Sequence, residues 1–477
     1  MKSKTFHINT IGCQMNVYDS SKMAAMLVNM GYSPAASPQH ADLVIVNTCT
    51  IRAKAKQKAT SFLGRLASAK RRNPGMVIGV GGCVAQEEGR RLLGRFPQVD
   101  IVFGTHAVSR LPALVKQVVT RGDRLVDVET TPAIDEAMPT IRSDMADQHP
   151  GMIAQCSEFV TIMRGCDNYC TYCVVPHVRG RETSRAPDMI VKEVEGLVSA
   201  GIREVTLLGQ NVNSYGKKEG LCTFAELLAM VNDIEGLMRI RFTTSHPKDL
   251  SRELVDAFGR LEKVCSHFHL PVQSGSNRIL KRMNRKYTKE QYLEKLSWLR
   301  AVRPDIAITT DIIAGFPGET TEDFEETLSL LEAVSFDSIF AFMYSDRSLA
   351  PAATFGDKVP EAEKNRRLNT LLSVQEQISQ QKNRTLCGRT ESVLVEGTSR
   401  IMTGKTETNG RLQWSGRTGS NKVVNFVADD TCHNHEAIGT GALVDVAITD
   451  GFAHSLRGTA VSVTKQSVKT EGCTYAA

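Results

Sequence analysis

The sequence predicts an α/β protein with three domains: an open parallel α/β sheet, a partial (β/α)6 barrel and a small β-barrel. Residues 4–120, and again those from Phe159 onward, alternate strand-like runs with helical apolar spacing, which is typical of parallel α/β folds. Over 391–463 the pattern changes to short β-runs separated by glycine turns. A chain of 477 residues is also too long for a single core.

The amino-terminal domain, residues 1–120, contains the strand-like runs KTFHINT, ADLVIVNT, MVIGVGG and VDIVFGT. Cys13, Cys49 and Cys83 each come directly after one of the first three of these strands. The carboxyl ends of parallel strands meet at one edge of a sheet, where such folds place their sites. We therefore expect these three thiols, far apart in the sequence, to converge in space.

The rest of the chain divides where the pattern changes. Residues 121–150 lose periodicity and carry Pro and acidic residues, as a linker does. Residues 151–383 supply the runs FVTIM, EVTLLG, RIRFTT, HFHL, IAITTDIIAG and SIFAFM, which predict a partial barrel whose active face lies at the carboxyl ends of the strands. Residues 384–465 predict a small β-barrel of a type often used to bind nucleic acid, and 466–477 form a tail.

The composition is that of an ordinary globular protein, with 41% hydrophobic and 23% charged residues. No window approaches eighteen apolar residues, and the first residues lack the apolar core and cleavage site of a signal peptide. We therefore expect a cytoplasmic protein with no membrane partner. In that reducing compartment, clustered cysteines among the twelve indicate metal binding or catalysis rather than disulfides.

The net charge of +6 is distributed unevenly. No Asp or Glu lies between Leu43 and Gln86, whereas eight lysines and arginines do. Such a segment is either a solvated face or a surface that contacts nucleic-acid phosphates.

The stretch MRGCDNYCTYCVVP, residues 163–176, carries the most specific motif. The motif contains three cysteines, Cys166, Cys170 and Cys173. A tetrahedral zinc site takes four ligands, and only His177 lies within reach as a fourth. A [4Fe–4S] cluster held by three thiolates leaves one iron open to a small molecule. The remaining cysteines are expected to be packing residues: Cys156, Cys222, Cys265, Cys387, Cys432 and Cys473.

This motif, with Tyr172 before its third cysteine, closely resembles that of the radical S-adenosylmethionine (SAM) enzymes. In that family SAM chelates the open iron, and one electron cleaves it to a 5′-deoxyadenosyl radical. Gln210 and Asn211, in LLGQNVNSYG, stand where the superfamily usually has a Gly-Gly-Glu motif. Later strand ends supply the other expected SAM contacts, although each alone also fits an ordinary βα turn. These residues are Ser245, Gln273, Gly315, Phe316, Gly318 and Glu319.

Nearly the whole chain resembles the methylthiotransferases of the MiaB type. The resemblance rests on TIGCQMNVYDS, RGCDNYCTYCVVPHVRGRETSR, LGQNVNSYG, HLPVQSGSNRILKRMNRKYT, GFPGET and a TRAM-like barrel that ends in HSLRG. GCQMN favours the tRNA-modifying branch over the ribosomal-protein branch. One departure is YSDRSLAPAA at 344–353, where family members commonly have a Gly-Thr turn.

The resemblance implies that Cys13, Cys49 and Cys83 hold an auxiliary [4Fe–4S] cluster that carries the sulfur to be inserted. One SAM would methylate that sulfur, and a second would supply the radical, because an adenine C2–H offers no acidic proton or leaving group. The substrate would be N6-isopentenyladenosine next to the anticodon of tRNA, and the product its 2-methylthio derivative. A single-stranded loop base can enter a barrel mouth without melting a helix.

The same resemblance implies an electron donor such as flavodoxin or ferredoxin and a sulfur source, and we expect a monomer. In VRGRETSR, candidates for contact with the substrate or the SAM carboxylate are Arg179, Arg181 and Arg185.

Three alternatives remain open from the sequence. A sister methylthiotransferase that acts on threonylcarbamoyladenosine or on a ribosomal protein would share every cysteine. A different radical SAM enzyme would use the second cluster only for electron transfer. A protein of another class would be a non-catalytic, zinc-containing RNA-binding protein, which iron and sulfide analysis would exclude.

Overall fold

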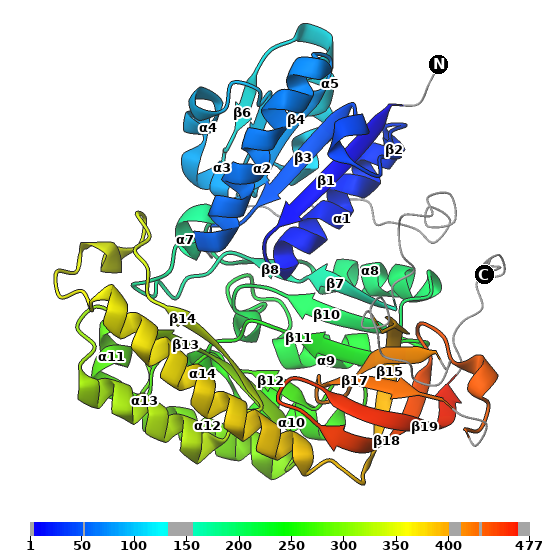
Figure 1. Ribbon diagram of the computed structural model, residues 1–477, viewed down its shortest axis with the longest axis vertical. Helices are drawn as coiled ribbons and strands as arrows, with labels where there is room; N and C mark the ends of the chain where they lie inside the picture. Colours follow the sequence, from blue (N-terminus) through cyan, green and yellow to red (C-terminus); the bar gives the residue numbers. More distant parts are fainter. Residues whose placement is uncertain (1–3, 51–52, 132–155, 400–411, 429–431, 466–477) are drawn as a thin grey trace.

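The computed structural model describes residues 4–50, 53–131, 156–399, 412–428 and 432–465. It confirms the predicted fold class: an amino-terminal parallel sheet lies above a central α/β domain, and a small β-barrel packs beside the central domain (Figure 1).

The amino-terminal domain is a six-stranded parallel sheet with the order β2-β1-β3-β4-β5-β6. Both faces of β3 and β4 are buried, because helices cover the sheet on each side and form two separate cores. The strands are β1 (Thr5–Ile11), β2 (Ser33–Pro34), β3 (Leu43–Thr48), β4 (Val77–Gly82), β5 (Ile101–Phe103) and β6 (Leu125–Asp127). The helices are α1 (Gln14–Asn29), α2 (Ala53–Arg72), α3 (Cys83–Glu88), α4 (Arg90–Arg95) and α5 (Leu111–Arg121).

This domain extends beyond the boundary predicted at residue 120. Strand β6 pairs with β5, so the first part of the predicted linker 121–150 belongs to the sheet. Leu125 and Val126 pack against the cores on opposite faces. A strand of three residues at an edge is too short for its alternation to stand out in the sequence. Residues 132–150 lie outside the described residues.

The central domain contains all six predicted strands, in the parallel sheets β11-β10-β7 and β12-β13-β14. A bridge between Ile240 and Val264 connects the two sheets, and β7 and β14 form the open edges of a partial barrel. The strands are β7 (Ser157–Thr161), β10 (Glu204–Leu208), β11 (Arg239–Phe242), β12 (His267–His269), β13 (Ala307–Ala314) and β14 (Ser338–Met343). The outer helices are α8 (Pro187–Ser199), α9 (Phe224–Asn232), α10 (Arg252–Arg260), α11 (Asn277–Arg282), α12 (Lys289–Val302) and α13 (Thr321–Val334).

Three short elements follow β7 and surround the CxxxCxxC motif: β8 (Met163–Arg164), α7 (Val175–Val178) and β9 (Thr183–Ser184). Strands β8 and β9 pair, so the motif lies in a loop that is closed at its base.

The carboxyl-terminal domain is the predicted β-barrel, closed in the order β15-β16-β17-β19-β18. The long helix α14 (Glu361–Arg384) leads into it along the central domain (Figure 1). Its strands are β15 (Thr390–Thr398), β16 (Gln413–Thr418), β17 (Val423–Val427), β18 (Leu443–Gly451) and β19 (Leu456–Lys465).

The turn between β16 and β17 docks against the amino-terminal ends of the central strands. Arg239 donates to the carbonyl of Arg417 at 2.6 Å, and Arg241 to that of Thr418 at 2.7 Å. Arg241 also pairs with Glu204, the first residue of β10, at 2.9 Å. These buried guanidinium groups satisfy carbonyls that an exposed turn would leave to water.

Candidate active site

The structure brings Cys13, Cys49 and Cys83 together at the carboxyl edge of the amino-terminal sheet. Cys13 precedes α1, Cys49 follows β3, and Cys83 is the first residue of α3 after β4. Strands β1, β3 and β4 are neighbours, and the chain order reverses between β1 and β3, which is where open α/β sheets bind their ligands. Cys13 and Cys49 are hydrogen-bonded to each other.

Two asparagines that the sequence did not single out hold this edge in place. Asn16 accepts hydrogen bonds from the backbone N–H of Cys13 at 3.2 Å and from its Sγ at 3.3 Å. The side chains of Asn16 and Asn47 are joined by a 2.9 Å hydrogen bond, and both are buried. Gly82 has φ +89°, and a Cβ there would meet the Thr48 carbonyl at 2.4 Å, so only glycine fits. Asn16 is the last residue of the GCQMN motif, and that motif was the sequence signal that could have identified it as a site residue.

The three thiols differ in their electrostatics. The hydrogen bond with Cys49, assisted by Arg179 and opposed by burial, lowers the pKa of Cys13 to about 5. Burial raises the pKa of Cys83. The lowered pKa of Cys13 favours its thiolate, the form in which cysteine binds metals, and Cys49 and Cys83 are buried beside it.

Arg179 reaches this site from the central domain. It is only 3% exposed, lies 3.3 Å from Asp19 on α1, and is hydrogen-bonded to Cys83. The preceding helix α7 packs on α3, where Val174 and Val178 contact Cys83. The sequence suggested contact with the substrate or SAM for this residue, whereas the structure places it at the amino-terminal cysteines.

The CxxxCxxC loop brings its own three cysteines together between β8 and α7. Burial raises the pKa of Cys166 to about 11 and that of Cys173 to about 12, and the charge of Cys170 contributes to both shifts. Gln210, at the end of β10, accepts a hydrogen bond from the backbone N–H of Gly165, so its side chain supports this loop.

Arg285 is a site residue that the sequence analysis missed. Its buried guanidinium donates to Cys170 Sγ at 3.4 Å and contacts the Tyr172 hydroxyl at 3.2 Å. It is held by the Pro271 carbonyl at 2.6 Å and the Tyr287 hydroxyl at 2.9 Å. Arg285 lies within the quoted segment HLPVQSGSNRILKRMNRKYT, but nothing in its spacing distinguished it from the other basic residues there.

The predicted SAM contacts lie at the carboxyl ends of the central strands, and several side chains are already engaged. Asn211 donates to Asp249 at 2.8 Å, and Ser245 donates to the His269 carbonyl. Glu319 forms a buried 2.6 Å ion pair with Arg367.

The glycine-rich end of β13 and the neighbouring Gln273 have special backbone conformations. Gln273 (φ +75°), Gly315 (φ +72°) and Gly318 (φ +82°) adopt positive φ, and Phe316 is fully buried beside Tyr172. The backbone N–H of Gly315 donates to Glu319 at 3.0 Å. That any of these residues contacts SAM stays a prediction.

Like Arg179, the other two arginines in VRGRETSR form ion pairs. Arg185 is buried and donates to Glu193 and to the Thr161 carbonyl, both at 2.7 Å. Glu193 also binds Lys22 of α1 at 2.7 Å, so this group joins the amino-terminal and central domains. Arg181 is exposed and pairs with Asp167 at 2.6 Å.

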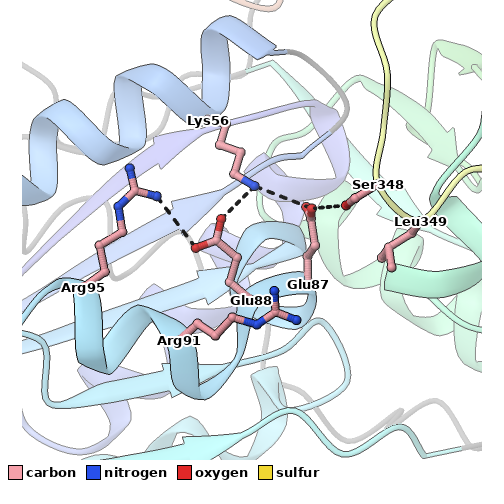
Figure 2. A pocket seen from close by; sticks show the side chains of 7 residues that line it. All are labelled: Lys56, Glu87, Glu88, Arg91, Arg95, Ser348 and Leu349. Atoms are coloured by element: carbon pink, nitrogen blue, oxygen red, sulfur yellow. Dashed lines mark hydrogen bonds and ion pairs between the residues drawn. The ribbon is translucent and has the colours of Figure 1, made fainter. Parts of the chain in front are cut away.

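The unusual stretch 344–353 closes one side of a pocket against the amino-terminal domain. The pocket has a volume of about 420 Å³ and is lined by Lys56, Glu87, Glu88, Arg91, Arg95, Ser348 and Leu349. Figure 2 shows Lys56 between the two glutamates, with Ser348 hydrogen-bonded to Glu87 from the opposite side at 3.4 Å.

Two absences hold within the part of the chain that the structure describes. No three His, Cys, Asp or Glu side chains there are grouped closely enough to ligate a single metal ion. No helix there is long and apolar enough to cross a membrane.

Comparisons with known proteins agree with this architecture. Residues 160–331 match the radical SAM superfamily, and residues 5–104 match the uncharacterized protein family UPF0004. The tRNA-2-methylthio-N(6)-dimethylallyladenosine synthase of Desulfosudis oleivorans is 60% identical over 97% of this chain and 98% of its own. The protein of the same name from Geotalea uraniireducens is 47% identical over 96% of this chain and 99% of its own.

A solved structure shares the fold at much lower identity. The radical SAM methyltransferase TsrM from Kitasatospora setae, with cobalamin and a [4Fe-4S] cluster bound, superposes with a TM-score of 0.55 at 13% identity, covering 74% of this chain and 77% of that chain. That structure shows the fold alone, whereas the relatives that match nearly the whole chain identify its family. The chain belongs to the family of tRNA-2-methylthio-N(6)-dimethylallyladenosine synthases within the radical SAM superfamily.

Proposed function

We propose that this protein attaches a methylthio group to C2 of N6-isopentenyladenosine next to the anticodon of tRNA, using SAM and two [4Fe–4S] clusters. One observation carries the proposal: the segment from Cys173 to Arg179 runs directly from one cysteine trio to the other. Because Val174 and α7 are helical, these six residues span roughly 9 Å. The two trios therefore serve one reaction.

The residues present fit both clusters, because each thiolate of a [4Fe–4S] cluster binds a different iron and a trio need not converge on a single ion, as none does among the described residues. Cys166, Cys170 and Cys173 would hold the SAM-binding cluster, and Arg285 would offset the charge of its thiolates. Cys13, Cys49 and Cys83 would hold the auxiliary cluster, with the low pKa of Cys13 and the guanidinium of Arg179 favouring bound thiolates. When bound, the first cluster supplies an open iron and an electron for SAM cleavage, and the second supplies the sulfur.

Around these ligands the chain contributes positioning. The pair of β8 with β9 and the Gln210 side chain hold the CxxxCxxC loop on the end of the barrel. Tyr172 is packed with Phe316 and Tyr344, so the cysteine loop is anchored to the end of β13. We further propose a cytoplasmic monomer, an electron donor such as flavodoxin or ferredoxin, and an external sulfur source.

The test separates the two cysteine trios. Replacing Cys166, Cys170 and Cys173 by Ala should remove about half of the iron and abolish 5′-deoxyadenosine formation, because a cluster does not persist without its thiolates. Replacing Cys13, Cys49 and Cys83 should also remove about half of the iron, but should leave SAM cleavage measurable and eliminate the methylthiolated nucleoside. Anaerobic incubation with tRNA, SAM and reductant, followed by nucleoside mass spectrometry, measures each outcome.

A matched control replaces Cys222, Cys265 and Cys387, which lie in neither trio, and should retain full iron and product. Methylthiolated product at wild-type yield without Cys13, Cys49 and Cys83 would contradict the auxiliary-cluster assignment. Product on tRNA that carries threonylcarbamoyladenosine, and none on prenylated tRNA, would favour the sister enzyme.

A further inference from the structure

Arg285 places a permanent positive charge beside the cysteines of the CxxxCxxC loop. It is only 4% exposed, and its Nη1 donates to Cys170 Sγ at 3.4 Å and to the Tyr172 hydroxyl at 3.2 Å. A guanidinium stays protonated in proteins, so this charge is fixed. Cys173 Sγ accepts instead from a neutral donor, the backbone N–H of Val175, at 3.5 Å. The second cysteine of the loop is therefore the one that receives a charged hydrogen bond.

The rest of the guanidinium is held by uncharged acceptors. Nη2 donates to the Pro271 carbonyl at 2.6 Å, and Nε donates to the Tyr287 hydroxyl at 2.9 Å. That hydroxyl in turn donates to the Val272 carbonyl at 2.8 Å. Within the described residues Arg285 forms no ion pair with a carboxylate. Since a buried charge is costly unless it is compensated, thiolates in the neighbouring loop are the anions that suit it.

The segment that carries Arg285 also fixes the cysteine loop from outside. The Asn284 side chain donates to the Tyr169 carbonyl at 2.9 Å, and the backbone N–H of Thr171 donates to the Met283 carbonyl at 3.1 Å. Tyr169 (φ +48°) and Asn284 (φ +60°) both adopt positive φ, a conformation that costs free energy and persists only where the surroundings enforce it. These contacts lie on both sides of the second cysteine, so the fold sets its distance from the guanidinium.

We propose that Arg285 sets the reduction potential of the cluster that Cys166, Cys170 and Cys173 would hold, and thereby determines how readily that cluster accepts the electron used to cleave SAM. This inference rests on the proposed function and deepens it. Arg285 acts through Cys170 and not on the substrate, so it is a positioning residue rather than a catalytic one.

The direction of the effect follows from charge. One electron passes from an external donor of the flavodoxin or ferredoxin class, which is oxidised, to the cluster, which is reduced and gains one negative charge. A fixed positive charge in a buried site stabilises the more negative form. Net charge and hydrogen bonds to the sulfurs are the means by which proteins tune these potentials. Arg285 therefore raises the potential and makes the cluster easier to reduce.

The experiment measures the potential itself. Redox titrations of the full-length reconstituted enzyme without SAM, followed by electron paramagnetic resonance, would be repeated in the Cys13→Ala/Cys49→Ala/Cys83→Ala background, where only the cluster of the CxxxCxxC loop contributes. Arg285→Gln removes the charge and keeps a hydrogen-bond donor. At a fixed ambient potential we expect about tenfold less reduced relative to oxidised cluster, which for a one-electron couple is a shift of about 59 mV to lower potential. Arg285→Lys keeps a charge without the guanidinium fork, so its potential should lie between the two.

The matched control is Arg303→Gln. Arg303 is half-buried, and its guanidinium donates to the carbonyls of Val264 at 2.6 Å and Leu261 at 2.8 Å. Both carbonyls precede β12 and so lie toward the amino-terminal end of the barrel, away from the cysteines. The loss of this guanidinium should lower stability and leave the potential unchanged.

A wild-type potential in Arg285→Gln that retains full iron would overturn the inference, even if that variant bound SAM more weakly. If Arg285→Gln does not retain iron, Arg285→Lys decides: a potential below that of the wild type supports the inference, and an equal one overturns it. Wild-type enzyme that formed no methylthiolated nucleoside would contradict the proposed function, whereas an unchanged potential in enzyme that makes this product contradicts only the role of Arg285. The two failures are therefore distinguishable.

Discussion

At the scale of single residues, Arg179 is the clearest case of one side chain joining two domains. It belongs to the central domain by sequence, but its partners Asp19 and Cys83 belong to the amino-terminal sheet. A buried guanidinium is tolerated only when its charge is paired, and Asp19 supplies that pairing. Removing the arginine would leave a carboxylate buried beside the cysteine trio.

We therefore expect Arg179→Met to lower the free energy of unfolding of the cluster-free protein by about 3–5 kcal/mol, measured by urea titration, because Asp19 loses its counter-charge. Adding Asp19→Asn should recover part of the loss. The control is Arg181→Met, two residues away, where an exposed ion pair with Asp167 contributes nothing measurable. A urea midpoint for Arg179→Met equal to that of the wild type would contradict the role of the buried pair.

At the scale of elements, the sequence predicted each of the six central strands and the sheet edge that gathers Cys13, Cys49 and Cys83. Those predictions succeeded because hydrophobic periodicity and strand-end position are local properties. Arg285 and the docking of the β16–β17 turn were not predictable, since both depend on contacts between residues more than a hundred positions apart. Strand β6 was missed because three residues carry too little pattern.

The docking of the β-barrel also depends on Asp337, at the start of β14. It binds Lys382 of α14 at 2.6 Å and Lys422 of the β16–β17 turn at 3.0 Å. Burial raises the pKa of Asp337, but the two ammonium groups outweigh that effect and hold it below its usual value. The carboxylate thus ties the barrel to the central domain while it stays ionised.

We expect Asp337→Asn to lower the free energy of unfolding by about 2 kcal/mol at neutral pH, because two lysines lose a charged acceptor. A carboxyl with a depressed folded-state pKa contributes stability above its unfolded pKa of about 3.9 and loses it as the pH falls through the folded value. The difference between wild type and variant should therefore be constant from pH 7 to about 5 and shrink below about 4. Urea titrations across this range measure it, and a difference that grew on acidification would exclude the ion pairs as its source.

At the scale of the whole molecule, the segment between Leu43 and Gln86, which contains no Asp or Glu, is less uniformly basic in three dimensions than in sequence. Lys56 pairs with Glu88 and Lys70 with Asp100, both at 2.7 Å, so acidic residues from later in the chain neutralise part of it. Several other basic side chains of α2 are exposed: Lys58, Arg65, Arg71 and Arg72. The pocket of Figure 2 lies at the edge of this surface, between the amino-terminal domain and the stretch 344–353.

Arg91 is the side chain of that pocket best placed to contact a tRNA phosphate. It is exposed, and it makes no ion pair within the described parts of the chain, whereas Lys56 and Arg95 face Glu88.

Removing residues 384–477, the carboxyl-terminal barrel and tail, would be a poor test of tRNA binding. It would deprive Arg239 and Arg241 of their carbonyl partners and disturb the central domain. Single basic residues give a cleaner measurement.

We expect Arg91→Ala to weaken tRNA binding and to flatten the plot of log affinity against log salt by about 0.7–0.9, because each lost phosphate contact releases one counterion fewer. The matched control is Arg260→Ala, an exposed arginine at the end of α10, which runs back to the amino-terminal edge of the barrel, away from the cysteines. Its salt slope should equal that of the wild type. Equal salt slopes for all three proteins would show that the pocket is not part of the tRNA interface. A flatter slope for Arg91→Ala alone would place the anticodon arm across the junction of the amino-terminal and central domains, within reach of both cysteine trios.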